Sequence, residues 1–194
     1  MGKGTRRAPR RRASTTRGAR AAPGAPMHFE ELDETTRGHM MRAFEEDEAA
    51  GVVWSRLLNG HGLAIYAQLM REAIRHGDET TLEAGLMDPS LWKAHDSGGK
   101  RAPFEASSRR LAVTEFGTMY TRGLCRRLEA EGETRCVIYR AGPAAEPRCE
   151  CTALEGKAVA IGELLANHRR YNGPGLRVPS GPSCHHSVRR APGL

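Results

Sequence analysis

The chain has 194 residues and a formal net charge of +7, with 30 Lys and Arg against 23 Asp and Glu. Hydrophobic residues make up 39% of the sequence and aromatic residues 5%, so the core is modest, and the length allows one domain or one domain with a small appendix. These values exclude a large enzyme barrel. No run approaches the ~20 consecutive apolar residues of a membrane-spanning helix, and the start of the chain lacks the ~7–15 apolar residues of a secretory signal. We therefore expect a soluble intracellular protein without a membrane partner.

The net positive charge of the chain lies in its first 27 residues. They contain eight basic residues and no acidic one, so the rest of the chain sums to −1. A segment of Arg, Ala, Pro, Gly, Ser and Thr buries too little apolar surface to offset the entropy lost on ordering, so residues 1–27 are predicted to be a disordered basic arm. Arginines in such an arm can neutralise nucleic-acid phosphates. The arginines concerned are Arg6, Arg7, Arg10, Arg11, Arg12, Arg17 and Arg20.

Two other interpretations of this arm remain open. Met27 opens the first segment with a foldable pattern, so the arm is alternatively an upstream extension produced by start-site choice, or a solubilising segment. The arm also lacks aromatic residues, on which the bases of single-stranded nucleic acid stack. DNA binding by residues 1–27 is therefore one hypothesis of three.

Residues 28–105 are predicted to be a helical region. Apolar residues recur there at spacings of three and four, which places them on one face of a helix. The cluster of Asn59, Gly60 and Gly62 is predicted to break the chain between the first two helices. The expected elements are helices over residues 28–50, 63–76 and 80–87 and a loop over residues 94–103.

Residues 106–194 are predicted to hold one long helix followed by a small Cys- and His-bearing unit. The helix covers residues 107–131, and Gly132 is suited to its left-handed cap. A strand is expected over residues 136–139. The fold class is therefore α+β and mostly α-helical. The remaining expected elements are a Cys-bearing loop from Gly142, a strand over residues 157–161, a short helix over 163–170 and a Gly- and Pro-rich loop over 172–183.

Three of the five cysteines lie in the last third of the chain, where Cys149 and Cys151 form Cys-Glu-Cys and Cys184 directly precedes His185 and His186. Intracellular thiols stay reduced, so a metal site suits this pattern better than a set of disulfides. Zinc prefers four tetrahedral thiolate and imidazole ligands, and ligand pairs on two short turns can close one site. We predict a structural zinc held by a Cys₃His set, namely Cys149, Cys151, Cys184 and His186.

The ligand set has alternatives. His168 can replace Cys149, because a gap of one residue between two thiolates is tighter than the usual two to four. His185 is predicted either to contact a metal ligand without binding the metal itself or to face solvent, since adjacent side chains diverge. Without a metal, Cys149 and Cys184 are ordinary reduced thiols and the histidines lie at the surface. The two other cysteines, Cys125 and Cys136, are predicted to be small buried apolar residues.

Three short motifs occur in order after residue 107. Thr114 and Glu115 lie on the long helix, residues 151–156 read Cys-Thr-Ala-Leu-Glu-Gly, and residues 179–186 read Pro-Ser-Gly-Pro-Ser-Cys-His-His. This order resembles the C-terminal domain of phage Mu F-like head morphogenesis proteins, the minor head proteins of tailed phages. In that family a helix with Arg-Thr-Glu leads through a strand to Cys-x-x-Leu-x-Gly and a closing Pro-Pro-x-His-Pro-x-Cys-x-Cys.

The resemblance implies both a set of metal ligands and a function. Cys151 and Cys184 match family cysteines, and His186 stands where the last cysteine of the family motif would be. Two positions depart from the family pattern: Gly181 replaces the motif histidine, and Cys149 lies one residue closer to Cys151 than the corresponding family cysteine does. The resemblance implies a minor structural protein of virion assembly, located in the host cytoplasm or the virion interior. Its partners would be capsid protein, portal protein or packaged DNA, and its zinc would be architectural.

An enzymatic alternative comes from histidines that lie beside arginines, at His168 and over residues 184–190. Histidine can activate water and arginine can hold phosphate, so the alternative function is a small metal-dependent nuclease or a zinc-stabilised nucleic-acid-binding protein. Few carboxylates follow residue 149, which disfavours a hard cation, and no catalytic residue is assigned. The alternating Glu129, Glu131 and Glu133 follow a periodic helix and are predicted to be a solvated acidic face.

Overall fold

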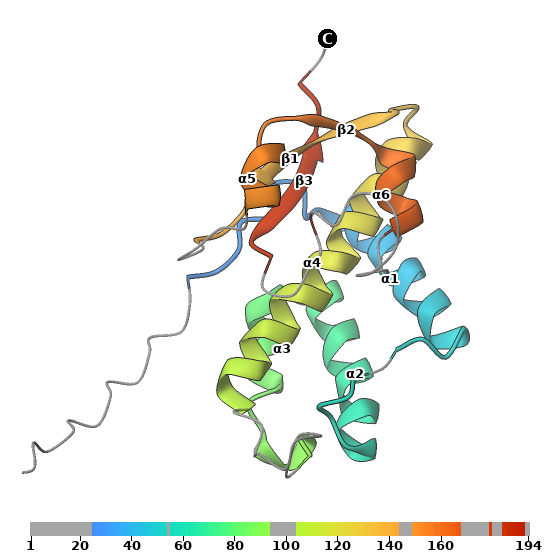
Figure 1. Ribbon diagram of the computed structural model, residues 1–194. Helices are drawn as coiled ribbons and strands as arrows, with labels where there is room; N and C mark the ends of the chain where they lie inside the picture. The colour runs from blue at the N-terminus through green and yellow to red at the C-terminus, as the bar shows by residue number, and fades with distance from the viewer. Residues whose placement is uncertain are drawn as a thin grey trace, which may run out of the picture.

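The computed structural model describes residues 25–53, 55–93, 104–143, 149–167, 179 and 184–192, without the side chains of residues 149–151 and 167. Residues 1–24 of the predicted arm, the predicted loop over 94–103 and nearly all of the predicted loop over 172–183 lie outside these residues. The described part is mostly helical with one small antiparallel sheet, which confirms the predicted α+β, mostly α class. Figure 1 shows the sheet at one end and α2 and α3 at the other, with the long helix α4 running between them.

Helix α1 (Glu34–Ala49) begins later than the sequence pattern predicts. Asp33 caps it by accepting a hydrogen bond from the backbone N–H of Thr36 at 3.0 Å. The preceding residues are not helical; residues 25–32 form an irregular segment with a turn at residues 30 and 31, which we name the strap. The His28 N–H donates to the carbonyl of Ala141 at 2.6 Å. The apolar residues of the strap still face the core, because the ring of Phe29 packs 4.6 Å from that of Tyr120.

Helix α2 (Gly60–His76) begins where the sequence pattern predicts a break. The Asn59 side chain accepts from the N–H of Gly62 at 2.7 Å, so the Asn-Gly cluster is the N-terminal cap of the helix. A Cβ on Gly62 would come within 2.0 Å of the carbonyl oxygen of Leu91, so glycine permits a close backbone approach there. Helix α3 (Glu79–Gly85) matches its prediction, and a short 3₁₀ helix, η1 (Pro89–Leu91), follows it.

Helix α4 (Phe104–Ala130) is the predicted long helix, and it organises the core. It packs against α1 and α3 and also contacts β3 and α6. Among the described residues, the buried apolar side chains form one cluster that extends from Met27 to Val188. Gly123 lets α1 approach closely, since a Cβ there would lie 2.9 Å from the backbone nitrogen of Met40. Gly132 has a φ of +87°, which confirms its predicted role as the left-handed cap.

The sheet has three strands in the order β2-β1-β3, with both pairings antiparallel. Strands β1 (Arg135–Arg140) and β2 (Ala158–Ala160) confirm the two predicted strands. Strand β3 (His186–Arg190) was not predicted, and it places Arg190 opposite Cys136 and His186 opposite Arg140. Helix α6 (Ile161–Asn167) directly follows β2.

One further helix lies inside the predicted Cys-bearing loop. Helix α5 (Cys149–Leu154) contains both residues of the Cys-Glu-Cys motif, and Figure 1 shows it beside the sheet. None of the helices that the structure describes is long and apolar enough to cross a membrane.

Candidate functional site

Two of the predicted metal ligands lie together at the beginning of β3. Cys184 and His186 are 5% and 4% exposed, and the Cys184 Sγ atom lies 4.0 Å from the His186 Nδ1 atom. The low exposed fraction of both side chains argues against the alternative that they are ordinary surface residues, because surface side chains stay in contact with water. These two residues are therefore the best-defined part of the candidate site.

A third side chain joins them from the end of α5. The Nε2 atom of His186 lies 2.7 Å from Oε1 of Glu155, and the Nε–H of Arg140 donates to the same oxygen at 2.7 Å. Arg140, and after it His186, hold the pKa of Glu155 below its ordinary value. Glu155 is thus an ionised acceptor at neutral pH, and the hydrogen between it and His186 belongs to the imidazole Nε2.

Local backbone geometry explains why these groups meet. Helix α5 ends at Leu154, and Gly156 then turns the chain with a φ of +74°, which glycine adopts without strain. The N–H of Gly156 donates to the carbonyl of Ile138 at 2.8 Å, which fixes the turn against β1. Because β1 pairs with β3 so that Arg140 faces His186, the carboxylate of Glu155 reaches both.

The donor chemistry of this pair fits a zinc ion. An imidazole that binds a metal carries one hydrogen, and with that hydrogen on Nε2 the ring of His186 would present the lone pair of Nδ1 on the side of Cys184. Two ligands of one tetrahedral zinc, at Zn–S ≈ 2.3 Å and Zn–N ≈ 2.1 Å, lie about 3.6 Å apart, close to the observed 4.0 Å. The carboxylate behind the imidazole matches the outer shell that orients most metal-bound histidines.

The other predicted ligands are less defined. Cys149 and Cys151 lie on α5, the helix that ends next to Glu155, and their side chains are outside the described part; His168 is wholly outside it. Among the side chains that are described, no group of three or more His, Cys, Asp or Glu is arranged to hold a metal ion. Two of the predicted ligands, Cys184 and His186, therefore lie together, and the placement of the others stays a prediction.

His185 lies apart from His186. Its carbonyl accepts from the N–H groups of Ala141 and Gly142, and its ring lies near Gly142 and Met27, where a Cβ on Gly142 would be 3.2 Å from His185 Nδ1. Burial, and after it the charge of Arg109, lowers the pKa of His185. The half-buried ring packs against the strap, rather than joining Cys184.

Cys125 and Cys136 are both 0% exposed, which confirms the prediction that they are buried. A hydrogen bond between the Cys125 and Cys136 thiols, together with burial, raises the pKa of the Cys125 thiol. The Cys125 thiol therefore stays protonated at neutral pH and is unsuited to a nucleophilic or metal-ligand role.

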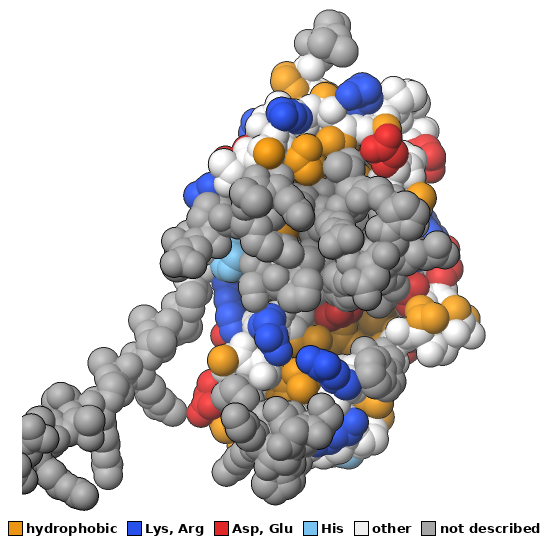
Figure 2. Space-filling view, in the orientation of Figure 1, with side chains coloured by type: hydrophobic (Ala, Val, Ile, Leu, Met, Phe, Trp, Pro, Cys, Tyr) orange, Lys and Arg blue, Asp and Glu red, His pale blue; other side chains and the backbone are white. Residues whose placement is uncertain are grey.

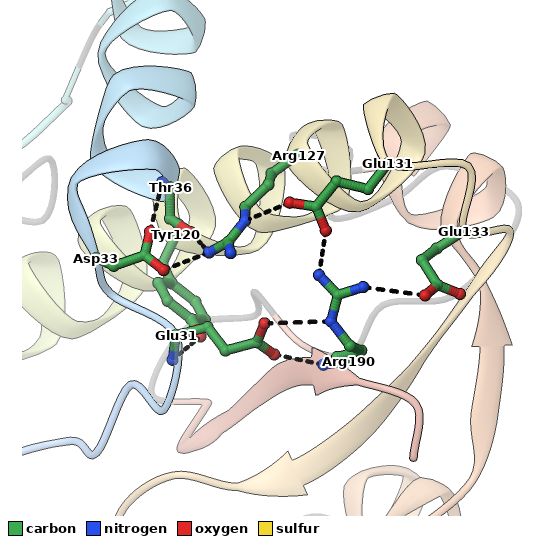
Figure 3. Close-up of polar contacts among 8 residues, drawn as sticks. All are labelled: Glu31, Asp33, Thr36, Tyr120, Arg127, Glu131, Glu133 and Arg190. Carbon is green, nitrogen blue, oxygen red and sulfur yellow. Dashed lines mark hydrogen bonds and ion pairs between the residues drawn. The ribbon is translucent and has the colours of Figure 1, made fainter. Parts of the chain in front are cut away.

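A second polar cluster, which we name the Arg190 clamp, lies at the other end of β3 (Figure 3). The guanidinium of Arg190 forms ion pairs with Glu131, Glu133 and Glu31, and its backbone N–H donates to Glu31 Oε1 at 2.5 Å. Glu131 also pairs with Arg127 at 2.8 Å. Glu131 and Glu133 are therefore not a simply solvated acidic face as predicted; they tie the end of α4 to β3 and the strap.

Sequence reasoning missed Glu155 and the Arg190 clamp for the same reason. Both contacts join residues that are distant in sequence, 31 residues for Glu155 and His186 and 59 for Glu131 and Arg190. Nothing in the local pattern marks either glutamate. The one available signal was that Glu155 lies inside the Cys-x-x-Leu-x-Gly motif, where an acidic residue directly precedes the turn glycine.

No protein-family model, no curated protein and no solved structure matches this chain. The seven arginines predicted to bind nucleic acid, from Arg6 to Arg20, lie outside the described residues.

Proposed function

We propose that this protein is a structural or assembly protein similar to the minor head proteins of tailed phages, with a C-terminal unit closed by zinc. The observation that supports it is the meeting of the two motifs on which the resemblance depends. Glu155, in the Cys-x-x-Leu-x-Gly motif, lies 2.7 Å from His186, the last residue of the closing motif. A chance assembly of two short motifs would not be expected to bring them to one point of the fold.

The proposed zinc has a structural role. Cys184 and His186 would hold it from β3, with Cys149 and Cys151, or His168 in place of Cys149, completing the set. Sheet β2-β1-β3 is small, and its strands have three to six residues. Such a unit buries little apolar surface of its own, and an ion bound between α5 and β3 would supply the free energy that holds them together.

The proposed partners are capsid or portal protein, and DNA through the basic arm. On the face in Figure 2, Lys and Arg side chains lie both over the sheet and over the helices below it, with Asp and Glu side chains beside them. The strongest concentration of positive charge in the sequence is instead the arm, with eight basic residues and no acidic one in residues 1–27. The arm is therefore the proposed contact with DNA phosphates.

The test of the structural function is assembly with defined proteins. The genes beside that of this protein should encode portal, capsid or terminase proteins, and the chain should co-sediment with the portal or capsid protein at a fixed stoichiometry when the two are co-expressed. A variant that lacks residues 1–26 serves as the control, since it should keep the protein partner while losing affinity for DNA.

The same preparation separates the structural function from the nuclease alternative. We expect tightly held zinc and no nicking of supercoiled plasmid with added Mg²⁺ or Mn²⁺. Nicking that His168→Ala or His185→Ala abolishes would overturn the structural proposal, as would a genomic neighbourhood without virion proteins combined with no co-sedimentation.

A further inference from the structure

We propose that Glu155 is the positioning residue of the metal centre: it holds the Nε2–H of His186 so that Nδ1, next to Cys184, is the ligand atom. This inference rests on the proposed zinc site, and it adds a residue that neither the ligand pattern nor the resemblance includes. It predicts that a carboxylate that never touches the ion controls how tightly the ion is held.

The contact has the geometry that this role needs. The Nε2–Oε1 distance of 2.7 Å is that of a charge-assisted hydrogen bond, and the side chain of His186 is 1% exposed, so water does not compete for Nε2. A carboxylate that accepts this hydrogen fixes the tautomer and the ring orientation and makes the opposite nitrogen a better donor to a metal. That opposite nitrogen, Nδ1, faces the Cys184 sulfur at 4.0 Å.

Glu155 is itself held in place. Arg140 binds the same Oε1 atom at 2.7 Å, and the left-handed Gly156 fixes the backbone directly after the glutamate. Arg140 lies on β1, opposite His186 on β3, so the sheet register sets the spacing of all three side chains. A side chain with 31% exposure would otherwise move among rotamers and would hold the imidazole poorly.

A purely structural explanation gives a different expectation. If Glu155 only joins α5 to the sheet by ion pairs with Arg140 and His186, its loss lowers the stability of the metal-free protein and leaves the affinity of the site for metal unchanged. If it positions His186, its loss weakens metal binding and alters the ligand field, because the ring is then free to rotate or to place its hydrogen on Nδ1.

The experiment compares full-length wild type, Glu155→Ala, Glu155→Gln and the control Glu129→Gln, which removes an exposed carboxylate at the end of α4. Zinc affinity is measured by competition with a chromophoric chelator, and the visible spectrum of the Co²⁺-substituted protein reports ligand geometry. We expect Glu155→Ala to weaken zinc binding by about 10–100-fold and to shift the Co²⁺ bands. Glu155→Gln should recover part of the affinity, since its amide oxygen still accepts from Nε2, and Glu129→Gln should match wild type.

The outcomes separate the two proposals. A wild-type chain that takes up neither ion removes the zinc site of the proposed function, and the role of Glu155 falls with it. A wild-type chain that binds zinc, with Glu155→Ala binding equally well and giving the same Co²⁺ spectrum, overturns the role of Glu155 and leaves the zinc site in place. Thermal melts of the metal-free variants show whether each one folds.

Discussion

Replacing Arg122 with Met should be among the most destabilising single changes in this protein. Arg122 on α4 pairs with Asp47 on α1 at 2.5 Å, and the two side chains are 3% and 8% exposed. Removing the guanidinium leaves the Asp47 carboxylate in a site that water barely reaches, and breaking a buried pair in this way costs about 3–5 kcal/mol. Domains of this kind are stable by about 5–15 kcal/mol, so the variant loses a large fraction of the total.

Arg190→Ala is the matched comparison, because it removes an arginine with more ionic partners but less burial. The Arg190 side chain is 37% exposed, as is that of Glu131, and that of Glu133 is 40% exposed. Exposed pairs contribute about 0.2–1 kcal/mol each, so the loss should be on the order of 1 kcal/mol. This loss should also shrink at 1 M salt, where the Debye length is about 3 Å, whereas the loss in Arg122→Met should persist.

Urea denaturation of the three proteins at low and high salt measures both effects. The double variant Asp47→Leu/Arg122→Met should recover most of the stability that Arg122→Met loses, since both charges of the buried pair are then removed together. If Arg122→Met costs no more than Arg190→Ala, or if the double variant is no more stable than the single one, the assigned difference between the buried pair and the exposed clamp is wrong.

Three further predictions concern the metal, the response to pH and the arm. Cys184→Ala should lose bound zinc and abolish the lowering of the melting temperature that a chelator causes in wild type, because structural zinc couples binding to folding; a wild-type melt that chelator leaves unchanged contradicts the zinc site. Burial raises the pKa of Glu79, so its contribution to stability is present at low pH and is lost as the pH rises through the folded-state value; Glu79→Gln should therefore gain melting temperature relative to wild type between about pH 4 and pH 8. Glu131→Gln should show the opposite trend at lower pH, because Arg127, and after it Arg190, lower the pKa of Glu131. The contribution of Glu131 is present above the ordinary glutamate pKa of about 4.3 and is lost as the pH falls below it, so the loss of melting temperature in Glu131→Gln should disappear there; a loss that persists in acid would refute the assignment. Deleting residues 1–26 should weaken DNA binding and reduce the slope of log affinity against log salt by about 6 if all seven arginines contact phosphate, and an unchanged slope favours the start-site interpretation.

The sequence predicts those elements of the fold whose signal is local. The long helix α4 carries an apolar stripe from Leu111 to Leu128, and the left-handed Gly132 lies just after its end, so the sequence predicts both the helix and its C-terminus. Strand β1 is a short β-branched and aromatic run with turn residues on each side. In both cases the residues that define the element lie within it.

Other elements depend on partners that lie far away in sequence. Residues 28–32 have helical spacing, yet they form the non-helical strap because Glu30 and Glu31 donate their N–H groups to the hydroxyls of Tyr139 and Tyr120. Strand β3 lies in a Cys-His-His segment without strand character, and it becomes a strand by pairing with β1, about fifty residues earlier. The Asn59 cluster does separate α1 from α2 as predicted, but its two glycines lie in the first turn of α2, since a break and a cap use the same residue types.

Strand β3 connects the proposed metal centre to the helical region. Its first residue, His186, lies at the Cys184 and Glu155 site, and its last, Arg190, binds Glu31 of the strap and Glu131 and Glu133 after α4. The strap leads into α1, which packs along α4 and shares its buried ion pair. An ion that fixes the start of β3 therefore also limits the motion of the strap and the end of α4, because a five-residue strand leaves no flexible joint between the two clusters. The proposed zinc would thus stabilise the helical region as well as the small sheet, and the two should lose structure in one transition rather than separately.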